Sequence, residues 1–357
     1  MDETARADVI VGVDTHKHVH AAVAIDALGA RLGATTIPVG ERGCQALEAW
    51  ARSLGPIRAF GVEGTGSYGA GLSRFLVAQG HAVLEVNRPD RQLRRRKGKS
   101  DPLDAESAAR AVLGGQATAR PKSGTGTVEM IRHLKVARDT AVKGRTQAMV
   151  TLKAIIVGAP AALRERLDRI TGKMALIRHL AALRPGPITS TAASAKASLR
   201  AIARRWLALD EEIRGHDGHL ETLTAARAPE LVRAHGMGAG TAAAMLLLVG
   251  DNPERIRSEA AFAKLCGACP VPASSGKTTR HRLNRGGDRR ANAALHRVVV
   301  TRMRGHQPTL DYVRRRTREG KTKPEIMRCL KRFVAREIFG YLCATPKPAA
   351  EAGGSVP

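Results

Sequence analysis

Four acidic residues in this sequence could together bind divalent metal ions. Asp14 directly follows the apolar run 9–13, and Glu63 closes a second apolar run. Asp101 and Asp104 are three residues apart, so they share one face of a helix's first turn. Carboxylates gathered at one point repel each other unless cations neutralise them, and two Mg²⁺ ions about 3.5–4 Å apart can hold the attacking and leaving oxygens of a phosphodiester. The four acids therefore predict a two-metal site for phosphodiester chemistry.

Each acid also has a purely structural explanation. The stretch 101–104, Asp-Pro-Leu-Asp, matches a helix start with proline at the first helical position and an acid at the third. Glu63 could be a loop acid before Gly-Thr-Gly, and Asp14 could form a turn at a strand end. Capping alone is a poor explanation for all four acids in this order, so the metal site remains the favoured interpretation.

Two further groups of residues have metal-ligand types. His16, His18 and His20 alternate along a predicted strand and would share one face. Cys266 and Cys269 have the spacing of half a zinc site, but the sequence contains no second Cys-x-x-Cys. Such histidines are more often solvated or buried in a core, and we expect zinc at neither place.

The elements that would position the acids follow a recognisable order. Three strands are predicted at 8–14, 19–26 and 31–39, followed by alternating helices and strands at 41–54, 58–63, 70–79, 82–87 and 102–113. Three meandering strands followed by alternating helices and strands predict a mixed α/β sheet with helices on both faces. This is the order of the ribonuclease H fold.

The rest of the chain is predicted to be mostly helical. Helical periodicity covers 126–157, 161–170, 173–183 and 191–228, and the two long segments predict an antiparallel hairpin or coiled coil. Such a hairpin is too thin to bury its own apolar face, so it should pack against a partner subunit or another domain. Further helices are predicted at 287–304, 308–319 and 323–342, and the Ala-, Pro- and Gly-rich tail after Cys343 should be disordered.

Charge predicts a nucleic-acid partner. The chain carries 59 Lys and Arg against 32 Asp and Glu, a net charge of +27, and aromatic residues make up only 3%. Phosphate contacts should therefore dominate over base stacking. A loop at 88–99 is predicted to bind phosphates through Arg94, Arg95, Arg96, Lys97 and Lys99. The alternative is that this loop is merely a solvated charged surface. Gly236 and Gly238 before an apolar helix are typical of a helix-hairpin-helix, which binds DNA backbone.

Four motifs in this order resemble those of the DEDD transposases of the insertion sequence 110 family. They are Gly12–Lys17, Val62–Tyr68, Lys99–Ala105 and Pro270–Lys277, and they extend over nearly the whole chain. The resemblance implies a ribonuclease H-like domain similar to the resolvase RuvC over 7–120 and a helical coiled-coil region over 121–230. It also implies a C-terminal transposase domain with a catalytic serine over 231–343, before the tail at 344–357. The family recombines DNA with a bridge RNA that pairs with donor and target.

By this resemblance, the four acids are the Mg²⁺ ligands and a serine ahead of Gly276 forms a covalent link to DNA phosphate. Ser275 falls at the position of the family's serine, with Ser274 as the alternative, although a Ser-Ser-Gly sequence can also be a simple turn. A serine hydroxyl is a weak nucleophile at neutral pH and needs a base, a metal or a polarised phosphate. The DNA strand that is linked to this serine would be held by Lys277, Arg280, Arg282 and Arg285.

The acids and the charge predict a metal-dependent protein that acts on nucleic acid, and the resemblance implies an RNA-guided DNA recombinase that uses Mg²⁺ and a phosphoserine intermediate on double-stranded donor and target DNA. Its serine and acids lie on separate predicted domains, so they must dock, and a dimer or tetramer is expected. Two alternatives are a metal-dependent nuclease that hydrolyses branched DNA with water and a non-catalytic nucleic-acid-binding protein. No apolar run reaches membrane-spanning length and no signal peptide is evident, so we expect a cytoplasmic protein with reduced thiols.

Overall fold

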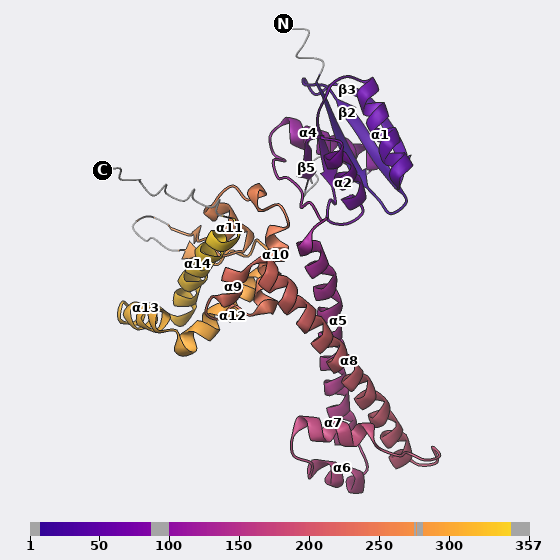
Figure 1. Cartoon of the computed structure of the whole chain (residues 1–357), viewed down its shortest axis with the longest axis vertical. Helices are drawn as coiled ribbons and strands as arrows, with labels where there is room; N and C mark the ends of the chain where they lie inside the picture. The colour runs from indigo at the N-terminus through magenta and orange to yellow at the C-terminus, as the bar shows by residue number, and fades with distance from the viewer. Residues whose placement is uncertain (1–7, 87–99, 275, 277–280, 344–357) are drawn as a thin grey trace, which may run out of the picture. The chain divides into compact units, whose positions relative to one another are not determined.

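The computed structural model describes residues 8–86, 100–274, 276 and 281–343 (Figure 1). The chain divides into two compact units. The first comprises Met1–Gly126 with Val249–Arg257, and the second comprises Thr127–Leu248 with Ser258–Pro357. The predicted tail at 344–357 lies outside the described residues. Among the described helices, none is both long and apolar enough to cross a membrane.

A five-stranded sheet forms the centre of the first unit, in the order β3-β2-β1-β4-β5. Its strands are β1 (Val9–Thr15), β2 (Val19–Ile25), β3 (Arg31–Pro38), β4 (Ile57–Glu63) and β5 (Val83–Val86). The first three strands pair antiparallel, whereas β4 runs parallel to both β1 and β5. The predicted mixed sheet is confirmed, and it is consistent with a RuvC-like domain.

Helices cover both faces of this sheet, as predicted. Helices α1 (Glu41–Ser53) and α2 (Ala70–Ala78) pack on the face that carries Val11 and Val13, and α4 (Asp101–Leu113) packs on the opposite face. Figure 1 shows α1 and α4 on either side of the strands. Because side chains alternate along a strand, Ile10, Gly12 and Asp14 point toward α4. The end of β1 therefore presents its acid on the side where α4 begins.

The segment after α10 (Ala239–Val249) belongs to the first unit although it comes late in the sequence. Asn252 donates from Nδ2 to the carbonyl of Pro121 at 2.9 Å, and its Oδ1 accepts from the amide of Ser123 at 3.2 Å. Asp251 accepts from the amide of Gly126 at 3.2 Å. These contacts tie the segment to the chain just before the first long helix, a long-range pairing that periodicity cannot reveal.

Two long antiparallel helices, α5 (Thr127–Val157) and α8 (Thr191–Arg227), pack against each other in the second unit. Their pairing shows in Arg138, whose Nε lies 2.6 Å from Asp217 Oδ1, and in the ion pair between Arg145 and Asp210. The hairpin is thus confirmed, while coiled-coil geometry stays a prediction.

The far end of this hairpin has a core of its own. Helices α6 (Ala161–Asp168) and α7 (Lys173–Ala181) cover it, as Figure 1 shows. Their Leu163, Leu167 and Ile177 pack with Trp206 of α8 in one buried cluster. The chain between the long helices therefore supplies part of the cover that we expected from a partner subunit or another domain.

The C-terminal part of the second unit is mostly helical. It contains α9 (Pro229–Arg233), most of α10, α11 (Glu259–Leu265), α12 (Arg289–Gly305), α13 (Gln307–Arg318) and α14 (Lys323–Leu342). A short antiparallel hairpin joins β6 (Val271–Pro272) to β7 (His281–Arg282). Helix α12 begins at an Asp288 cap, whose carboxylate accepts from the amide of Ala291 at 2.7 Å.

Candidate metal centre and serine hairpin

Glycines allow α4 to lie directly on the sheet. A Cβ at Gly12 would lie 1.9 Å from the carbonyl oxygen of Ala105, and one at Gly61 would lie 2.9 Å from that of Ala108. Any side chain at these two positions would therefore collide with the helix backbone. The close approach brings the first turn of α4, with its two acids, to the ends of β1 and β4.

Asp14 and Asp101 meet at this edge together with His16. The Nε2 of His16 lies 3.1 Å from Oδ2 of Asp14 and 3.3 Å from Oδ1 of Asp101. One possible ligand atom from each residue falls within a group whose members all lie within 4.8 Å of one another. Asp14 is buried, whereas Asp101 is exposed. The arrangement combines a fixed carboxylate with a more accessible one.

Asp104 lies close enough to influence Asp14. Burial raises the pKa of the Asp14 carboxyl above 3.8, and the negative charges of Asp104 and Asp101 raise it further, while His16 opposes the shift. Asp104 is itself only 3% exposed. Three of the four predicted acids thus share one electrostatic environment in which added positive charge would be favourable.

Glu63 occupies the end of the neighbouring strand. Val13 of β1 pairs with Val62 of β4, so the next residues along, Asp14 and Glu63, are neighbours across the sheet. Alternation along β4 places Glu63 on the same face as Gly61, toward α4. Thr15 ties the two strand ends together by donating from Oγ1 to the carbonyl of Glu63 at 2.9 Å. The carboxylate of Glu63 lies outside the 4.8 Å group.

This donor set fits a divalent cation. Hard cations such as Mg²⁺ prefer carboxylate oxygens, and the buried Asp14 needs a positive partner to stay ionised at low cost. The helix-start explanation for the acids of α4 is only partly apt, because the residue in the capping position is Ser100 and the side chain of Asp101 contacts His16. Neither acid of α4 therefore occupies the N-cap position, and their metal-binding role stays a prediction.

The histidines are arranged differently from the sequence prediction. Only His20 lies in strand β2, while His16 and His18 belong to the turn between β1 and β2, so the three do not alternate along one strand. His16 alone joins the acids. The sequence raised His16 as a possible ligand only through its alternation with His18 and His20, and that interpretation was not favoured. The proximity of His16 to Asp14 in the chain was the more useful signal.

The predicted serine region lies in the second unit, between β6 and β7. Ser274 is exposed and Gly276 adopts φ +52°, a conformation suited to a turn. Ser275, Lys277 and Arg280 lie outside the described residues. Arg282 and Arg285 are described and exposed.

The remaining predicted nucleic-acid contacts are a glycine pair and a basic run. Gly236 and Gly238 precede α10, with Gly238 exposed and open space around it. The helix-hairpin-helix assignment stays a prediction. Arg94, Arg95, Arg96, Lys97 and Lys99 lie outside the described residues.

The Cys266–Cys269 pair has structural roles. Cys266 is buried at the end of α11, and burial raises the pKa of its thiol to about 12, which disfavours the thiolate that zinc requires. The Sγ of Cys269 accepts from Nδ2 of Asn284 at 3.0 Å. Among the described residues, neither cysteine belongs to a metal-ligand cluster.

A mixed sheet with converging acids, followed by a mostly helical unit, is compatible with a protein that acts on nucleic acid. Comparison with protein families matches residues 11–159 to the DEDD transposase domain of the IS110 group and residues 228–314 to the transposase IS116/IS110/IS902 family. The two matches together cover more than half of the chain, which therefore belongs to the IS110 family of insertion-sequence transposases. A comparison with curated protein sequences found no match. The family implies DNA as substrate and divalent metal ions as cofactors.

Proposed function

We propose that this transposase is an RNA-guided DNA recombinase that cuts and rejoins strands through a covalent serine–DNA intermediate. The observation that carries the proposal is the convergence of Asp14, Asp101 and Asp104 at one sheet edge, in a chain whose family acts on DNA. The net charge of +27 supports a polyanionic partner, and the resemblance supports a bridge RNA that selects donor and target.

The four acids are the proposed ligands of Mg²⁺, two ions being expected. Asp14 would provide the fixed carboxylate and Asp101 the accessible one, with Glu63 and Asp104 completing the set. When bound, such ions neutralise charge that develops on a phosphoryl group. In this proposal the protein holds the carboxylates in place through the close packing of α4 on the sheet.

Ser275 is the proposed nucleophile, and Ser274 is the alternative. Its Oγ would form a bond to phosphorus while the bond from phosphorus to one deoxyribose oxygen breaks. The serine proton leaves Oγ, and the departing deoxyribose oxygen takes up a proton. Because one phosphodiester replaces another, a second deoxyribose hydroxyl can reverse the step and rejoin the strand without an external energy source.

The acids and the serine lie in different units, so the proposal requires the two units of a chain, or of two chains, to dock. We propose a dimer or tetramer as the active form, with Lys277, Arg280, Arg282 and Arg285 holding the DNA strand beside the serine. Docking would then control when cutting occurs, because neither unit contains all the reacting groups.

Covalent trapping tests the proposal directly. The full chain is incubated with labelled donor DNA, guide RNA and Mg²⁺, denatured, and examined for label that migrates with the protein. We expect an adduct in the wild type and in Ser274→Ala, and none in Ser275→Ala or Asp14→Asn.

Other outcomes separate the alternatives. An adduct that disappears only in Ser274→Ala would move the nucleophile by one residue, and one that survives in both serine variants would contradict the mechanism. Cut DNA without any adduct would support hydrolysis by water. Binding without cutting, unaffected by Asp14→Asn, would support a non-catalytic role.

A further inference from the structure

The C-terminal helices line a pocket of which the proposed chemistry uses only one residue, Arg282. It has a volume of about 810 Å³, within the range of ligand pockets, and lies wholly in the second unit. Its lining comes from the chain before β6, from β7 and the residues after it, and from α13 and α14. His281 and Arg282 of β7 line the pocket. It therefore begins at the base of the β6–β7 hairpin, which carries the predicted serine and is called the serine hairpin below.

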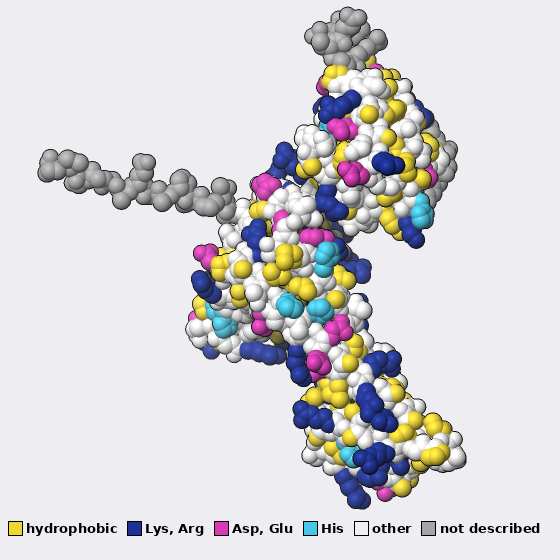
Figure 2. Space-filling view, turned by 45° about the vertical axis from the view of Figure 1, so that its right-hand side comes forward, with side chains coloured by type: hydrophobic (Ala, Val, Ile, Leu, Met, Phe, Trp, Pro, Cys, Tyr) yellow, Lys and Arg dark blue, Asp and Glu magenta, His cyan; other side chains and the backbone are white. Residues whose placement is uncertain are grey.

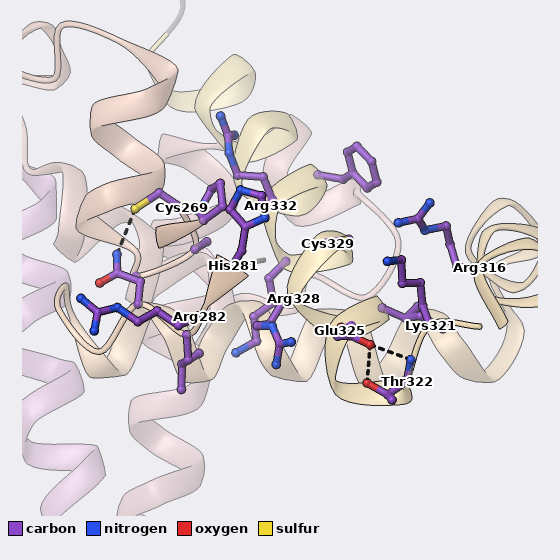
Figure 3. A pocket seen from close by; sticks show the side chains of 18 of the residues that line it. Cys269, His281, Arg282, Arg316, Lys321, Thr322, Glu325, Arg328, Cys329 and Arg332 are labelled. Atoms are coloured by element: carbon purple, nitrogen blue, oxygen red, sulfur yellow. Dashed lines mark hydrogen bonds between the residues drawn. The ribbon is translucent and has the colours of Figure 1, made fainter. Parts of the chain in front are cut away.

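Positive charge extends along this pocket. Figure 3 shows Arg282 at one end, Arg328 near the middle, and Lys321 with Arg316 at the other end. Among the described residues, Arg282, Arg328 and Lys321 form no salt bridge, whereas Arg316 pairs with Glu319. Glu325 interacts electrostatically with Lys321 and Arg328 without forming an ion pair with either. Three cationic groups are thus available to an outside anion.

The one carboxylate in the lining is already engaged. Glu325 accepts from the amide of Thr322 at 2.9 Å and from its Oγ1 at 2.7 Å, which closes a capping box at the start of α14. Lys331 is also held in place, because its Nζ donates to Oδ1 of Asn292 at 2.8 Å. The charge balance of the lining therefore favours an anion.

An aromatic side chain adds an apolar surface. Phe333 lines the pocket and is 45% exposed, whereas phenylalanine is among the residues most often buried in folded proteins. Tyr312 contacts it edge to face, with ring centroids 5.3 Å apart and an interplanar angle of 88°. Tyr312 supports the ring of Phe333 through this contact, so one part of the lining offers an aromatic surface on which a flat ring can stack.

We propose that this pocket binds an unpaired stretch of nucleic acid, with phosphates along Arg282, Arg328 and Lys321 and a base against Phe333. Spaced cations match a strand with repeating phosphates better than a single small anion. A duplex hides its base faces inside the stack and could offer the pocket only its backbone. A base can stack on the exposed aromatic ring of this concave, cationic lining only after it has left its pair.

This inference deepens the proposed function, because an unpaired nucleotide held at the base of the hairpin would bring its strand to the predicted serine. One stacked base is compatible with a chain in which phosphate contacts dominate overall. Both a DNA strand opened for cutting and a single-stranded part of the guide RNA have the required chemistry, and the test includes an arm for each.

The experiment measures binding of the full chain to short fluorescein-labelled oligothymidylate and oligouridylate, with a labelled duplex as the comparison. EDTA is present, so no cutting occurs and a failure here is distinct from a failure of the serine mechanism. We expect Phe333→Ala to weaken single-strand binding about tenfold, the size of one lost stacking contact, and to change duplex binding less than about twofold. Phe333→Trp should retain the affinity.

Arg328→Gln should weaken single-strand binding and lower the salt dependence by about one phosphate contact. Arg318→Gln, an exposed arginine of α13 outside the pocket lining, and Ile188→Ala, an exposed apolar residue elsewhere, are the matched controls. Thermal melting confirms that each variant is folded.

The outcomes decide whether the pocket binds an unpaired strand and whether that strand is DNA or RNA. Loss of oligothymidylate binding alone assigns the pocket to a DNA strand, loss of oligouridylate binding alone assigns it to RNA, and loss of both assigns it to either strand type. The proposal is overturned if Phe333→Ala and Arg328→Gln behave like the controls, or if they weaken duplex binding as much as single-strand binding.

Discussion

Asp14 illustrates the conflict between stability and function at a single residue. Its carboxyl is only 7% exposed, and burial with two neighbouring acids raises its pKa. His16 is the group that offsets part of this repulsion in the absence of other cations. A chain selected for stability alone would have little reason to keep an acid here.

Asp14→Asn should make the metal-free protein more stable. A raised pKa in the folded state means that stability falls as pH rises from 3.8 through the folded pKa, so the penalty is fully present at neutral pH. Removing the charge should raise the melting temperature in EDTA by a few degrees, corresponding to about 1 kcal/mol. Differential scanning fluorimetry measures this, and added Mg²⁺ or Mn²⁺ should stabilise only the wild type.

Asp26→Asn is the matched control, since Asp26 is also 7% exposed. Its Oδ1 accepts from the amides of Leu28 and Ala30, at 2.9 and 2.8 Å, and an asparagine oxygen can replace it. This variant should melt close to the wild type and keep its response to metal. Equal destabilisation of both variants in EDTA would contradict our account of Asp14.

The sequence was informative about acids and less so about their neighbours. Asp14 and Glu63 could be placed at strand ends because each follows a continuous apolar run, and parallel strands bring such ends to one edge. His16 could not be assigned, because its contact with Asp101 crosses from a turn to a helix and depends on how closely α4 approaches the sheet.

At the scale of elements, that approach depends on the glycines beneath α4. Gly12→Ala should destabilise the protein by at least about 2 kcal/mol, because its Cβ would collide with the backbone of Ala105 and push the helix away. The same displacement would separate Asp101 from Asp14, so the stabilising effect of divalent cations should shrink as well. Urea unfolding with and without Mg²⁺ measures both effects.

Gly71→Ala is the natural comparison for that substitution. Gly71 lies in α2, is exposed, and has nothing within 4 Å of an added Cβ. Alanine there should leave stability unchanged or raise it by about 0.5–1 kcal/mol through helix propensity. If both alanine variants unfolded alike, close packing under α4 could not be what holds the acids together.

A partly buried ion pair joins three elements of the second unit. Arg302 of α12 donates to both carboxylate oxygens of Glu337 in α14, at 2.7 and 2.9 Å, and from Nε to the carbonyl of His235 at 2.8 Å. The hydrogen bonds from Arg302 hold the pKa of Glu337 below 4.5. The pair therefore connects the loop before α10 to the two helices that frame the C-terminal region.

Glu337→Gln should cost about 2 kcal/mol at neutral pH, the size of a lost charged hydrogen-bond pair. A lowered carboxyl pKa stabilises the fold above its ordinary value of 4.5, and this contribution is lost as pH falls through the folded pKa. Denaturant unfolding at several pH values should show wild type and variant converging in acid. Glu319→Gln, which removes an exposed partner of Arg316, should show a much smaller difference at every pH.

Elements were predictable where they are long and periodic. The bounds of β1 through β4 and of the long helices α5, α8 and α14 agree with the ranges predicted from the sequence within one or two residues. The short helices α9 and α11 and the two-residue strands β6 and β7 were missed, because five to seven residues or fewer carry little periodic signal. The pocket could not be foreseen, since its lining comes from segments that only tertiary packing brings together.

At the scale of the whole molecule, positive charge is spread over many surfaces. Figure 2 shows Lys and Arg side chains over the far end of the helical hairpin. Exposed basic residues there include Arg164, Arg166, Arg169, Arg178 and Arg184, against the acids Glu165 and Asp168. Such groups should contact mainly phosphates, which carry no sequence information. The protein's own affinity should therefore depend little on the DNA sequence.

Binding of the whole chain to duplex DNA should therefore fall steeply with salt. If about six to ten phosphates are contacted, affinity should drop by about 10³ or more between about 50 and 200 mM salt, because each contact releases condensed counterions. Fluorescence anisotropy over this range gives the slope directly.

Replacing Arg164 and Arg169 with Gln should lower the slope by up to about two contacts if the hairpin end lies on DNA. Replacing Arg132 and Arg110 removes the same formal charge, but these pair with Glu129 and Glu106 and should leave the slope nearly unchanged. A shallow slope in the wild type would mean that the charge serves a purpose other than holding phosphates.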